Sequence, residues 1–402
     1  MKKFIIKGLY FLISILLLLL VLFLNIFKKI KFCQADMSRL GGITFIDWYL
    51  SINKVKKQKP ELIICFYNMT IDHINYQWFK IWRQKIFLIK NRNFFYILNF
   101  LIFKLKLDKA LLIDKNFLNQ KKLVKEQSYD NFKLLKDKYD FVVKDLEPNI
   151  QFSNNDNMIG KVFLKRLKLN ELKYVCFHNR DESFLEKKST INDWSHHSFR
   201  NSNIENYIEA AHYIHNQKLK SIRVGMVTDK KLANNFFYDY ANSNHQSDFG
   251  DIYIIKNCLF FVCSDTGISN VAECFKKPIV YVNFAALCDL FNVATITKGL
   301  IIFKKIYDLN SKKYLNFDDI KKLNINGSNI SNILEDNNLK LVENSPKEIL
   351  DVTQEMYLKQ IGAWHQDIND DKKQKDFWDK YFPGFNTSLS LKVGNKYLEE
   401  NF

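Results

Sequence analysis

Short, continuous apolar runs alternate with helical segments through the second half of the chain, and this alternation constrains the fold more than any other feature. Strands are predicted at 174–178 (YVCFH), 221–227 (SIRVGMV), 259–263 (LFFVC) and 278–283 (PIVYVN). Amphipathic or capped segments at 204–215 and 269–275 predict the helices between them, and 252–256 is a further short apolar segment. Apolar runs of about four to six residues between helices are typical of parallel strands covered on both faces. The second half is therefore predicted to be an α/β domain with a parallel sheet.

The chain before residue 170 shows a weaker pattern. A buried strand is predicted at 62–67 (LIICFY), two further candidates lie at 86–89 and 111–113, and aromatic spacing predicts a helix within 74–85. Near the end of the chain, Ser345 is followed by a proline and, three residues later, by a glutamate. This combination predicts a capped helix.

The first thirty residues contain an uncharged stretch, GLYFLISILLLLLVLFL at 8–24, with three lysines before it and three after it. With its apolar neighbours the stretch reaches about 20 residues, which is long enough to cross a bilayer as a helix. No small residues of a cleavage site follow it, so residues 1–31 are predicted to be a single uncleaved membrane anchor. The lysines are balanced on the two sides, so the charge does not decide the orientation.

Composition narrows the choice of partners and compartment. The net charge is +17, but 53 of the 60 basic residues are lysines spread along the chain, which does not indicate a nucleic-acid patch. Seven cysteines form neither a paired nor a zinc-type spacing, which indicates reduced thiols and a cytoplasmic catalytic portion. Three of the seven arginines, at 180, 200 and 223, lie close together in the sequence. A guanidinium offers a planar fork for phosphate that lysine lacks.

Polar clusters lie in, at the end of or directly after three of the predicted strands. These are HNRD at 178–181, RVG at 223–225 and SDTGISN at 264–270. In an open parallel sheet, ligands bind beyond the carboxyl ends of the strands, and the third cluster also opens a helix. We therefore expect a phosphate-binding site here, although each cluster alone is also compatible with an ordinary loop or helix cap.

Several common enzyme classes lack their motifs in this chain. No P-loop, GxGxxG, GxSxG or HExxH pattern occurs, which argues against P-loop NTPases, dinucleotide oxidoreductases, α/β-hydrolases and zincins. No DxD element occurs, and the adjacent His196 and His197 are interpreted as a solvated loop rather than metal ligands. No metal site and no cofactor are expected.

An ordered set of motifs then carries a family resemblance. The set comprises RLG at 39–41, HNRD at 178–181, FRN at 199–201, RVG at 223–225, SDFGDI at 247–252, CSDTGISN with KKPIVYVN at 263–283, and SPKEI with EM at 345–356. Together it resembles a family of bacterial glycosyltransferases found among surface-polysaccharide genes. Gly42 stands where similar sequences have a histidine.

The resemblance implies a GT-B-like fold, in which two Rossmann-like domains face a cleft behind the N-terminal transmembrane helix. It divides the chain into the anchor at 1–31, an N-terminal acceptor-side domain at 32–168, a C-terminal domain that binds the nucleotide-sugar at 169–344, and a helical tail at 345–402.

The resemblance also assigns roles to site residues. Arg180 would contact the donor's diphosphate with Arg223 as a second cation, and His178 or Asp181 would either act as the base or orient Arg180. Ser264, Thr266, Gly267 and Ser269 would donate hydrogen bonds to phosphate, and Glu273 would reach a ribose hydroxyl. The remaining candidates for donor binding are Arg200, Asn201, Gly225, Asp248 and Asn270.

The sequence thus predicts a membrane-anchored glycosyltransferase that moves a sugar from a nucleotide-sugar to a glycan or glycolipid at the bacterial inner membrane. Two alternatives stay open. One is a nucleotide-sugar epimerase of GT-B-like fold, and the other is a non-catalytic sugar- or nucleotide-binding member of a polysaccharide assembly complex.

Overall fold

The computed structural model describes most of the 402 residues. The described ranges are 2–113 without 72, 146–285 without 182, 184–194, 227, 229 and 233, and 298–402 without 324, 326–328 and 382–390. The chain forms two compact units, Met1–Glu126 and Gln127–Phe402. Unit 2 thus begins earlier than the expected boundary between 168 and 169.

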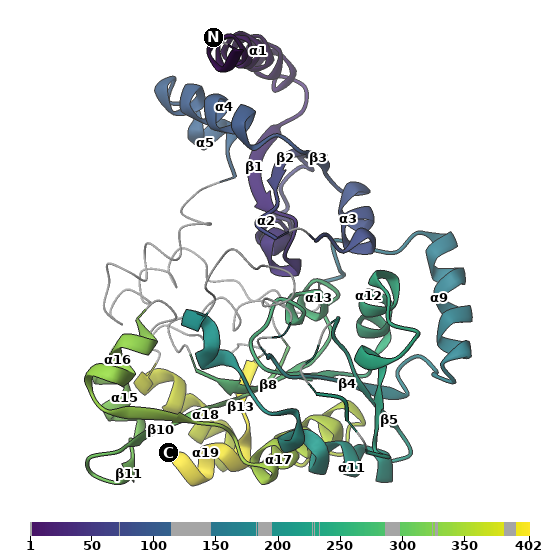
Figure 1. Ribbon diagram of the computed structural model, residues 1–402, viewed down its shortest axis with the longest axis vertical. Coiled ribbons are helices and arrows are strands. Elements are labelled where there is room, and N and C mark those ends of the chain that lie inside the picture. Colours follow the sequence, from purple (N-terminus) through teal and green to yellow (C-terminus); the bar gives the residue numbers. More distant parts are fainter. Residues whose placement is uncertain are drawn as a thin grey trace. The chain divides into compact units, whose positions relative to one another are not determined.

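Unit 1 is built on a three-stranded parallel sheet in the order β1-β2-β3 (Figure 1). Its elements are α1 (Lys2–Leu24), β1 (Ile30–Asp36), η1 (Leu40–Ile43), α2 (Thr44–Val55), β2 (Leu62–Asn68), α3 (Tyr76–Arg83), β3 (Phe87–Ile89), α4 (Arg92–Lys104) and α5 (Asp108–Leu111). β2, β3 and α3 confirm the predictions at 62–67, 86–89 and 74–85. The candidate strand at 111–113 is wrong, because α5 ends there and only Leu112 forms a bridge with Phe32.

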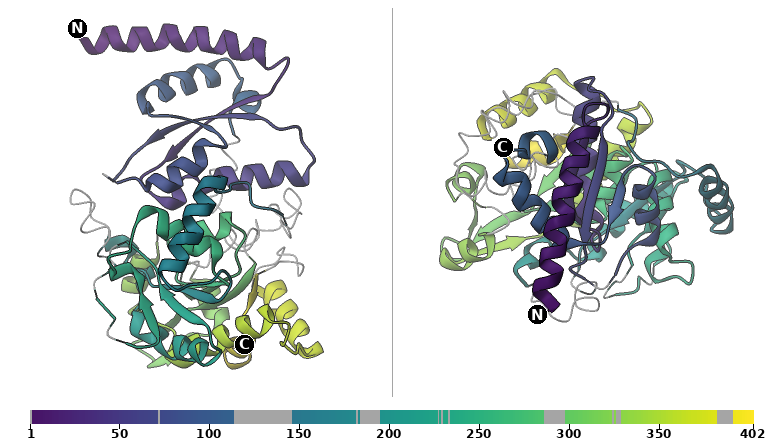
Figure 2. Two further views of the ribbon diagram at one scale, coloured as in Figure 1. Left: turned by 90° about the vertical axis from the view of Figure 1, so that its right-hand side faces the viewer. Right: turned by 90° about the horizontal axis from the view of Figure 1, so that it is seen from above.

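The core of unit 1 lies between the sheet and two helices. Phe32 of β1 and Phe66 of β2 pack against Phe94 and Leu98 of α4, and Leu18 of α1 joins the same cluster. Figure 2 shows α1 lying along α4. In the parts of the chain that the structure describes, no helix is long and apolar enough to cross a membrane. The predicted transmembrane helix is therefore not supported.

Unit 2 is built on a seven-stranded sheet in the order β13-β9-β8-β7-β4-β5-β6, and all neighbouring strands are parallel. The strands are β4 (Tyr174–His178), β5 (Lys220–Arg223), β6 (Phe237–Asp239), β7 (Phe261–Cys263), β8 (Ile279–Phe284), β9 (Gly299–Phe303) and β13 (Leu391–Val393). The predicted α/β fold with a parallel sheet is confirmed.

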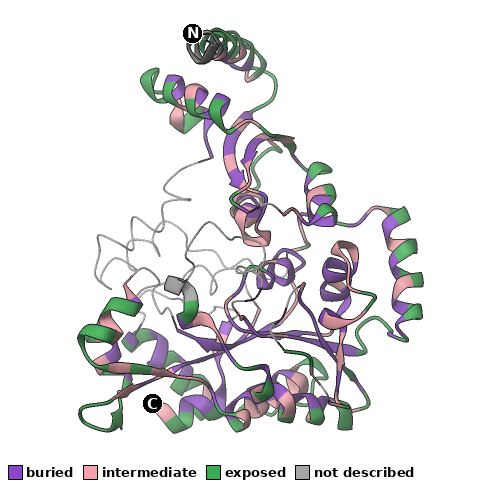
Figure 3. Cartoon of the chain, in the orientation of Figure 1, coloured by how far each residue is buried: buried purple, intermediate pink, exposed green. Residues whose placement is uncertain are grey.

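Helices cover both faces of this sheet. Figure 1 shows α11 (Ile208–Asn216) and α17 (Pro346–Gln360) on one face, and α12 (Asp248–Asn257) and α13 (Ser269–Cys274) on the other. The strands are almost entirely buried, which accounts for their continuous apolar runs (Figure 3). The apolar segment at 252–256 lies within α12.

The remaining elements of unit 2 surround this sheet. They are α9 (Asn154–Arg166), η3 (Ser195–Arg200), η4 (Ile204–Tyr207), η5 (Tyr240–Asn242), a small antiparallel sheet of β10 (Lys305–Asp308), β11 (Lys313–Tyr314) and β12 (Leu339–Val342), α15 (Phe317–Lys322), α16 (Ile330–Asp336), α18 (Ile368–Tyr381) and α19 (Asn395–Asn401).

The segment predicted as a helical tail, 345–402, belongs to the body of unit 2. The predicted capping box forms at the start of α17, where the Ser345 and Glu348 side chains each accept from the other's backbone N–H. β13 extends the main sheet beyond β9. Gln374 of α18 fixes this edge strand, because its amide donates to the Val393 carbonyl and accepts from the Val393 N–H. The tail is therefore an integral part of the α/β unit.

Candidate functional site

The sheet of unit 2 has a topological switch point at β4. From β4 the chain proceeds to β5 and β6 on one side, and it then returns to β7, β8 and β9 on the other. The crevice outside the carboxyl ends of β4 and β7 is where open parallel α/β sheets bind ligands. The predicted HNRD and SDTGISN segments follow these two strands directly.

Several predicted residues meet at this point. The backbone N–H of Arg180 donates to Ser264 Oγ at 3.0 Å, and its guanidinium donates to Asn201 Oδ1. Arg200 forms an ion pair with Asp265, with 3.6 Å between Nη1 and Oδ2. These contacts join the segments at 178–181 and 264–270, which were expected at one edge of the sheet, with the segment at 199–201, which lies at the end of η3.

Lys304 is a further cation in this group, and no sequence motif marks it. It follows β9, and its ammonium donates to the Asn201 carbonyl at 2.6 Å. Burial lowers the pKa of Lys304 to about 8, although Glu343 raises it, and the charge of Arg180 lowers it further. We define the switch-point cluster as the group of Arg180, Arg200, Asn201, Ser264 and Lys304.

Arg223 lies inside the sheet rather than at its surface. Its side chain is fully buried and pairs with Asp239 at 3.7 Å. It also donates to Asn179 Oδ1 at 3.3 Å and to the Lys230 carbonyl. These partners engage the guanidinium within the protein, so the predicted phosphate contact by Arg223 is not supported. Its contact orients Asn179, whose amide in turn donates to the Ser202 carbonyl at 2.8 Å.

His178 ends β4 in the neutral form. Its Nδ1 lies 2.9 Å from the Val224 carbonyl, which only accepts, so Nδ1 carries the proton. Burial lowers the pKa of His178 to about 4, the Val224 carbonyl raises it, and the charges of Arg223 and Arg180 lower it. Gly225 has a φ of 144°, and a Cβ at this position would lie 3.3 Å from Nδ1 of His178. The glycine thus lets the chain turn against the imidazole ring.

Two further predicted residues are Asp181, after β4, and Asp248, at the start of α12. Asp181 accepts from the backbone N–H of Ser183 at 3.2 Å. Asp248 is the first residue of α12, where the Ser247 hydroxyl caps the helix by accepting from the Gly250 N–H at 3.1 Å. The structure leaves their predicted roles as predictions.

The loop at 264–270 is held by the Thr266 carbonyl. It accepts from the backbone N–H and hydroxyl of Ser269 at 3.2 and 2.7 Å, and from Asn270 Nδ2 at 3.2 Å. The Thr266 hydroxyl is buried without a hydrogen-bond partner among the described residues. Gly267 is exposed at the turn. α13 has only six residues, so anion binding here depends more on the neighbouring cations than on a helix dipole.

Glu273 lies within α13 and is buried. The Tyr281 hydroxyl donates to its carboxylate. Burial raises the pKa of Tyr281, and the neighbouring Glu273 carboxylate raises it further. The predicted contact of Glu273 with a ribose stays a prediction.

Gly42 in unit 1 marks a close approach of two backbone segments. A Cβ at this position would lie 2.0 Å from the carbonyl oxygen of Asp36. A side chain at this position would therefore overlap the backbone of Asp36 in this conformation. The Asp36 carboxylate accepts from the backbone N–H and hydroxyl of Ser38 at 3.0 and 2.6 Å, so it closes the same turn.

Replacing Gly42 with alanine is expected to destabilise the fold by about 2–3 kcal/mol, because the backbone at Asp36 must move to relieve the overlap. Urea unfolding of the full chain measures this loss. Gly8→Ala is the matched control, since a Cβ there has no atom within 4 Å. Equal stability of the two variants would contradict the close approach.

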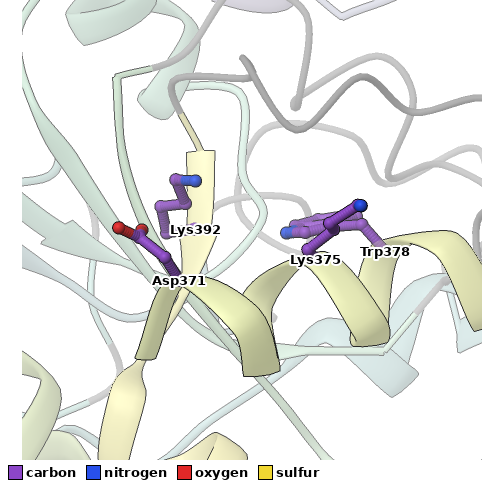
Figure 4. A pocket seen from close by; sticks show the side chains of 4 residues that line it. All are labelled: Asp371, Lys375, Trp378 and Lys392. Carbon is purple, nitrogen blue, oxygen red and sulfur yellow. The ribbon is translucent and has the colours of Figure 1, made fainter. Parts of the chain in front are cut away.

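A cavity of about 290 Å³ lies elsewhere in unit 2. Asp371, Lys375 and Trp378 of α18 and Lys392 of β13 line it (Figure 4). None of the predicted site residues is among them. In the described ranges, no group of three or more His, Cys, Asp or Glu residues has the arrangement of a metal site. His196 and His197, which were interpreted as part of a loop, lie in η3, and their side chains are not among those that the structure describes.

Unit 2 is thus a parallel α/β fold with three cationic side chains, those of Arg180, Arg200 and Lys304, in the switch-point cluster. Neither the protein-family models nor the curated protein sequences give a match. Among solved structures, the chain is similar to a family 9 glycosyl transferase from Veillonella parvula, at 10% identity and a TM-score of 0.44, over 82% of this chain and 98% of that one.

Two further similar structures come from E. coli. The ADP-heptose lipopolysaccharide heptosyltransferase II has 14% identity and a TM-score of 0.34, over 68% of this chain and 90% of that one. A heptosyltransferase with ADP-2-deoxy-2-fluoro-heptose has 9% identity and a TM-score of 0.31, over 64% and 88%. These identities and TM-scores are too low to indicate a function, so the chemistry of the switch-point cluster has to indicate it.

Proposed function

We propose that the switch-point cluster binds the diphosphate of a nucleotide-sugar and that the chain is a glycosyltransferase. The observation that carries this proposal is the placement of two buried cations, Arg180 and Lys304, near each other at the switch point. Like charges with little access to water repel each other, and a bound dianion offsets that cost. The order of motifs that resembles bacterial glycosyltransferases supports the same assignment.

The chemistry of sugar transfer suits this arrangement. The bond between the anomeric carbon and the donor phosphate breaks, the acceptor oxygen bonds to that carbon, and the acceptor proton passes to a base. The departing nucleoside diphosphate gains negative charge, which the guanidinium of Arg180 and the ammonium of Lys304 stabilise. The low pKa of His178 suits a positioning role for its ring. Asp181 is the other candidate for the base.

The acceptor in this proposal is a glycan or a glycolipid, and the nucleotide-sugar is a substrate rather than a cofactor. We place the catalytic portion on the cytoplasmic side of the bacterial inner membrane. Six cysteines within the described ranges are free and buried, which supports a reducing compartment.

A thermal-shift series tests the diphosphate site. The full chain is heated with the diphosphates of adenosine, guanosine, uridine and cytidine, each beside its monophosphate and nucleoside. At about one hundred times Kd, the matching diphosphate should stabilise the protein by about 2.7 kcal/mol, which raises Tm by several degrees. Equal shifts with a diphosphate and its nucleoside, or no shift with any diphosphate, would contradict the proposed site.

Diphosphate binding is also expected to weaken as pH rises from about 7 to 9.5. The pKa of Lys304 is about 8, so its ammonium loses its charge over this interval, whereas arginine stays charged. Titration calorimetry at several pH values measures the affinity. Lys304→Met should bind more weakly at pH 7 and should lose most of the pH dependence. Lys161→Met, an exposed position on α9, should behave as the unmodified chain does.

A further inference from the structure

One side of α1 packs on unit 1, and the other side is apolar although it is exposed. Leu18 and Val21 pack into the core of unit 1, and Ser14 on the same side is also buried. The other side exposes only large apolar residues between Leu9 and Leu24, and Leu16 and Leu20 are more than half exposed. A helix on a water-soluble surface presents polar residues outward, so this side of α1 requires an apolar partner.

The helix beneath α1 adds aromatic residues to the exposed surface. α4 exposes Tyr96 and Phe100, among others. The guanidinium of Arg92 lies 5.2 Å from the Tyr96 ring, and the ammonium of Lys104 lies 5.7 Å from the Phe100 ring. Figure 2 shows the two helices lying along each other. Aromatic rings with adjacent cations are typical of side chains at the boundary between lipid tails and headgroups. We call the exposed apolar residues of α1 and α4 the α1–α4 surface.

Basic residues greatly outnumber acidic residues in this part of the chain. Residues 1–113 contain 19 of the 60 basic residues but only five of the 43 acidic residues. Lys28 and Lys29 are exposed in the turn after α1, and Lys106 is exposed after the end of α4. Exposed lysines beside an apolar surface favour an anionic partner.

These features distinguish between two occupants. A second copy of the chain would cover the apolar residues, but it would bring the same lysines towards one another. An anionic lipid bilayer satisfies both requirements, because its tails accept the leucines and its headgroups accept the lysines. We propose that the α1–α4 surface docks on an anionic lipid bilayer. This proposal uses unit 1 alone and is independent of the sugar-transfer proposal.

Vesicle co-sedimentation of the full chain tests this docking. One set of vesicles is phosphatidylcholine, and the other contains about one part phosphatidylglycerol to three parts phosphatidylcholine. The chain should bind both and should bind the anionic vesicles about tenfold or more tightly.

Two pairs of substitutions separate the apolar and charged contributions. Leu16→Gln with Leu20→Gln should weaken binding to both kinds of vesicle about tenfold or more, because each leucine leaves the lipid. Lys28→Gln with Lys29→Gln should weaken binding only to the anionic vesicles. Met158→Gln with Val162→Gln changes two equally exposed residues of α9 and should bind as the unmodified chain does.

All four positions in the test pairs are exposed, and circular dichroism confirms that each variant is folded. Two results would overturn the proposal. One is binding of the leucine pair equal to that of the control pair. The other is sedimentation as a stable dimer that the leucine pair dissociates, which would assign the surface to a second copy of the chain.

Discussion

Arg180→Lys is expected to weaken nucleoside diphosphate binding about tenfold to a hundredfold, although the charge is unchanged. A guanidinium presents a planar fork to phosphate oxygens, whereas an ammonium presents a single point of charge. Hydrogen bonds to charged groups contribute about 1.5–3 kcal/mol each, which corresponds to this range of affinity. Arg180 also donates to Asn201, so a lysine would lose this orientation as well.

Titration calorimetry with the diphosphate identified by thermal shift measures this effect. Arg166→Lys is the matched control, because Arg166 is exposed in the last turn of α9. Affinity within twofold of the unmodified chain for both variants would remove Arg180 from the phosphate site.

The second large effect is expected for Arg223→Met, which should lower the free energy of unfolding of unit 2 by about 3–5 kcal/mol. Arg223 is fully buried, and its removal leaves the Asp239 carboxylate without its cation. The Lys230 carbonyl and Asn179 Oδ1 lose a donor at the same time. The cost arises from unpaired buried groups rather than from lost packing, since methionine fills much of the same space.

A double-mutant cycle isolates this mechanism. Asp239→Asn removes the negative charge but keeps an oxygen that accepts from the Leu232 N–H. The double variant should therefore lose less stability in urea unfolding than the sum of the single variants. Simple additivity would show that the ion pair is not the cause. Arg166→Met should change the stability by less than about 0.5 kcal/mol, because its side chain is exposed.

The strands of unit 2 that could be predicted are those with continuous apolar runs. β4 and β8 are buried along almost their whole length, and their sequences show it directly. β6 and β13 have three residues each, which is too short for a periodic signal. β13 joins β9 across about ninety residues of sequence, and no local pattern encodes that pairing. Pairing of distant segments therefore limits what the sequence alone predicts.

α12 shows a different limit. Six consecutive residues, from Gly250 to Ile255, are buried, so the helix has no polar side and lacks the 3.6-residue period that identifies amphipathic helices. In contrast, α17 was predictable from its cap, because Ser345, Pro346 and Glu348 act through local contacts.

The candidate site also has some contacts that the sequence predicts and others that only the structure shows. Strand ends place Arg180 and Ser264 together, and the sequence predicts this from the rule for parallel sheets. Lys304 enters the site through a contact with Asn201 more than one hundred residues away. The arginine count singles out Arg223, but only the structure shows that its partner is Asp239.

The most direct test of the proposed function follows a radiolabelled sugar from a panel of nucleotide-sugars incubated with the full chain and bacterial glycolipids. We predict that one donor transfers its sugar to the acceptor with release of an equal amount of nucleoside diphosphate, and that Arg180→Lys slows this transfer while Arg166→Lys does not. Conversion of the donor into an isomer without release of the diphosphate, or tight donor binding without turnover, would contradict glycosyltransferase activity.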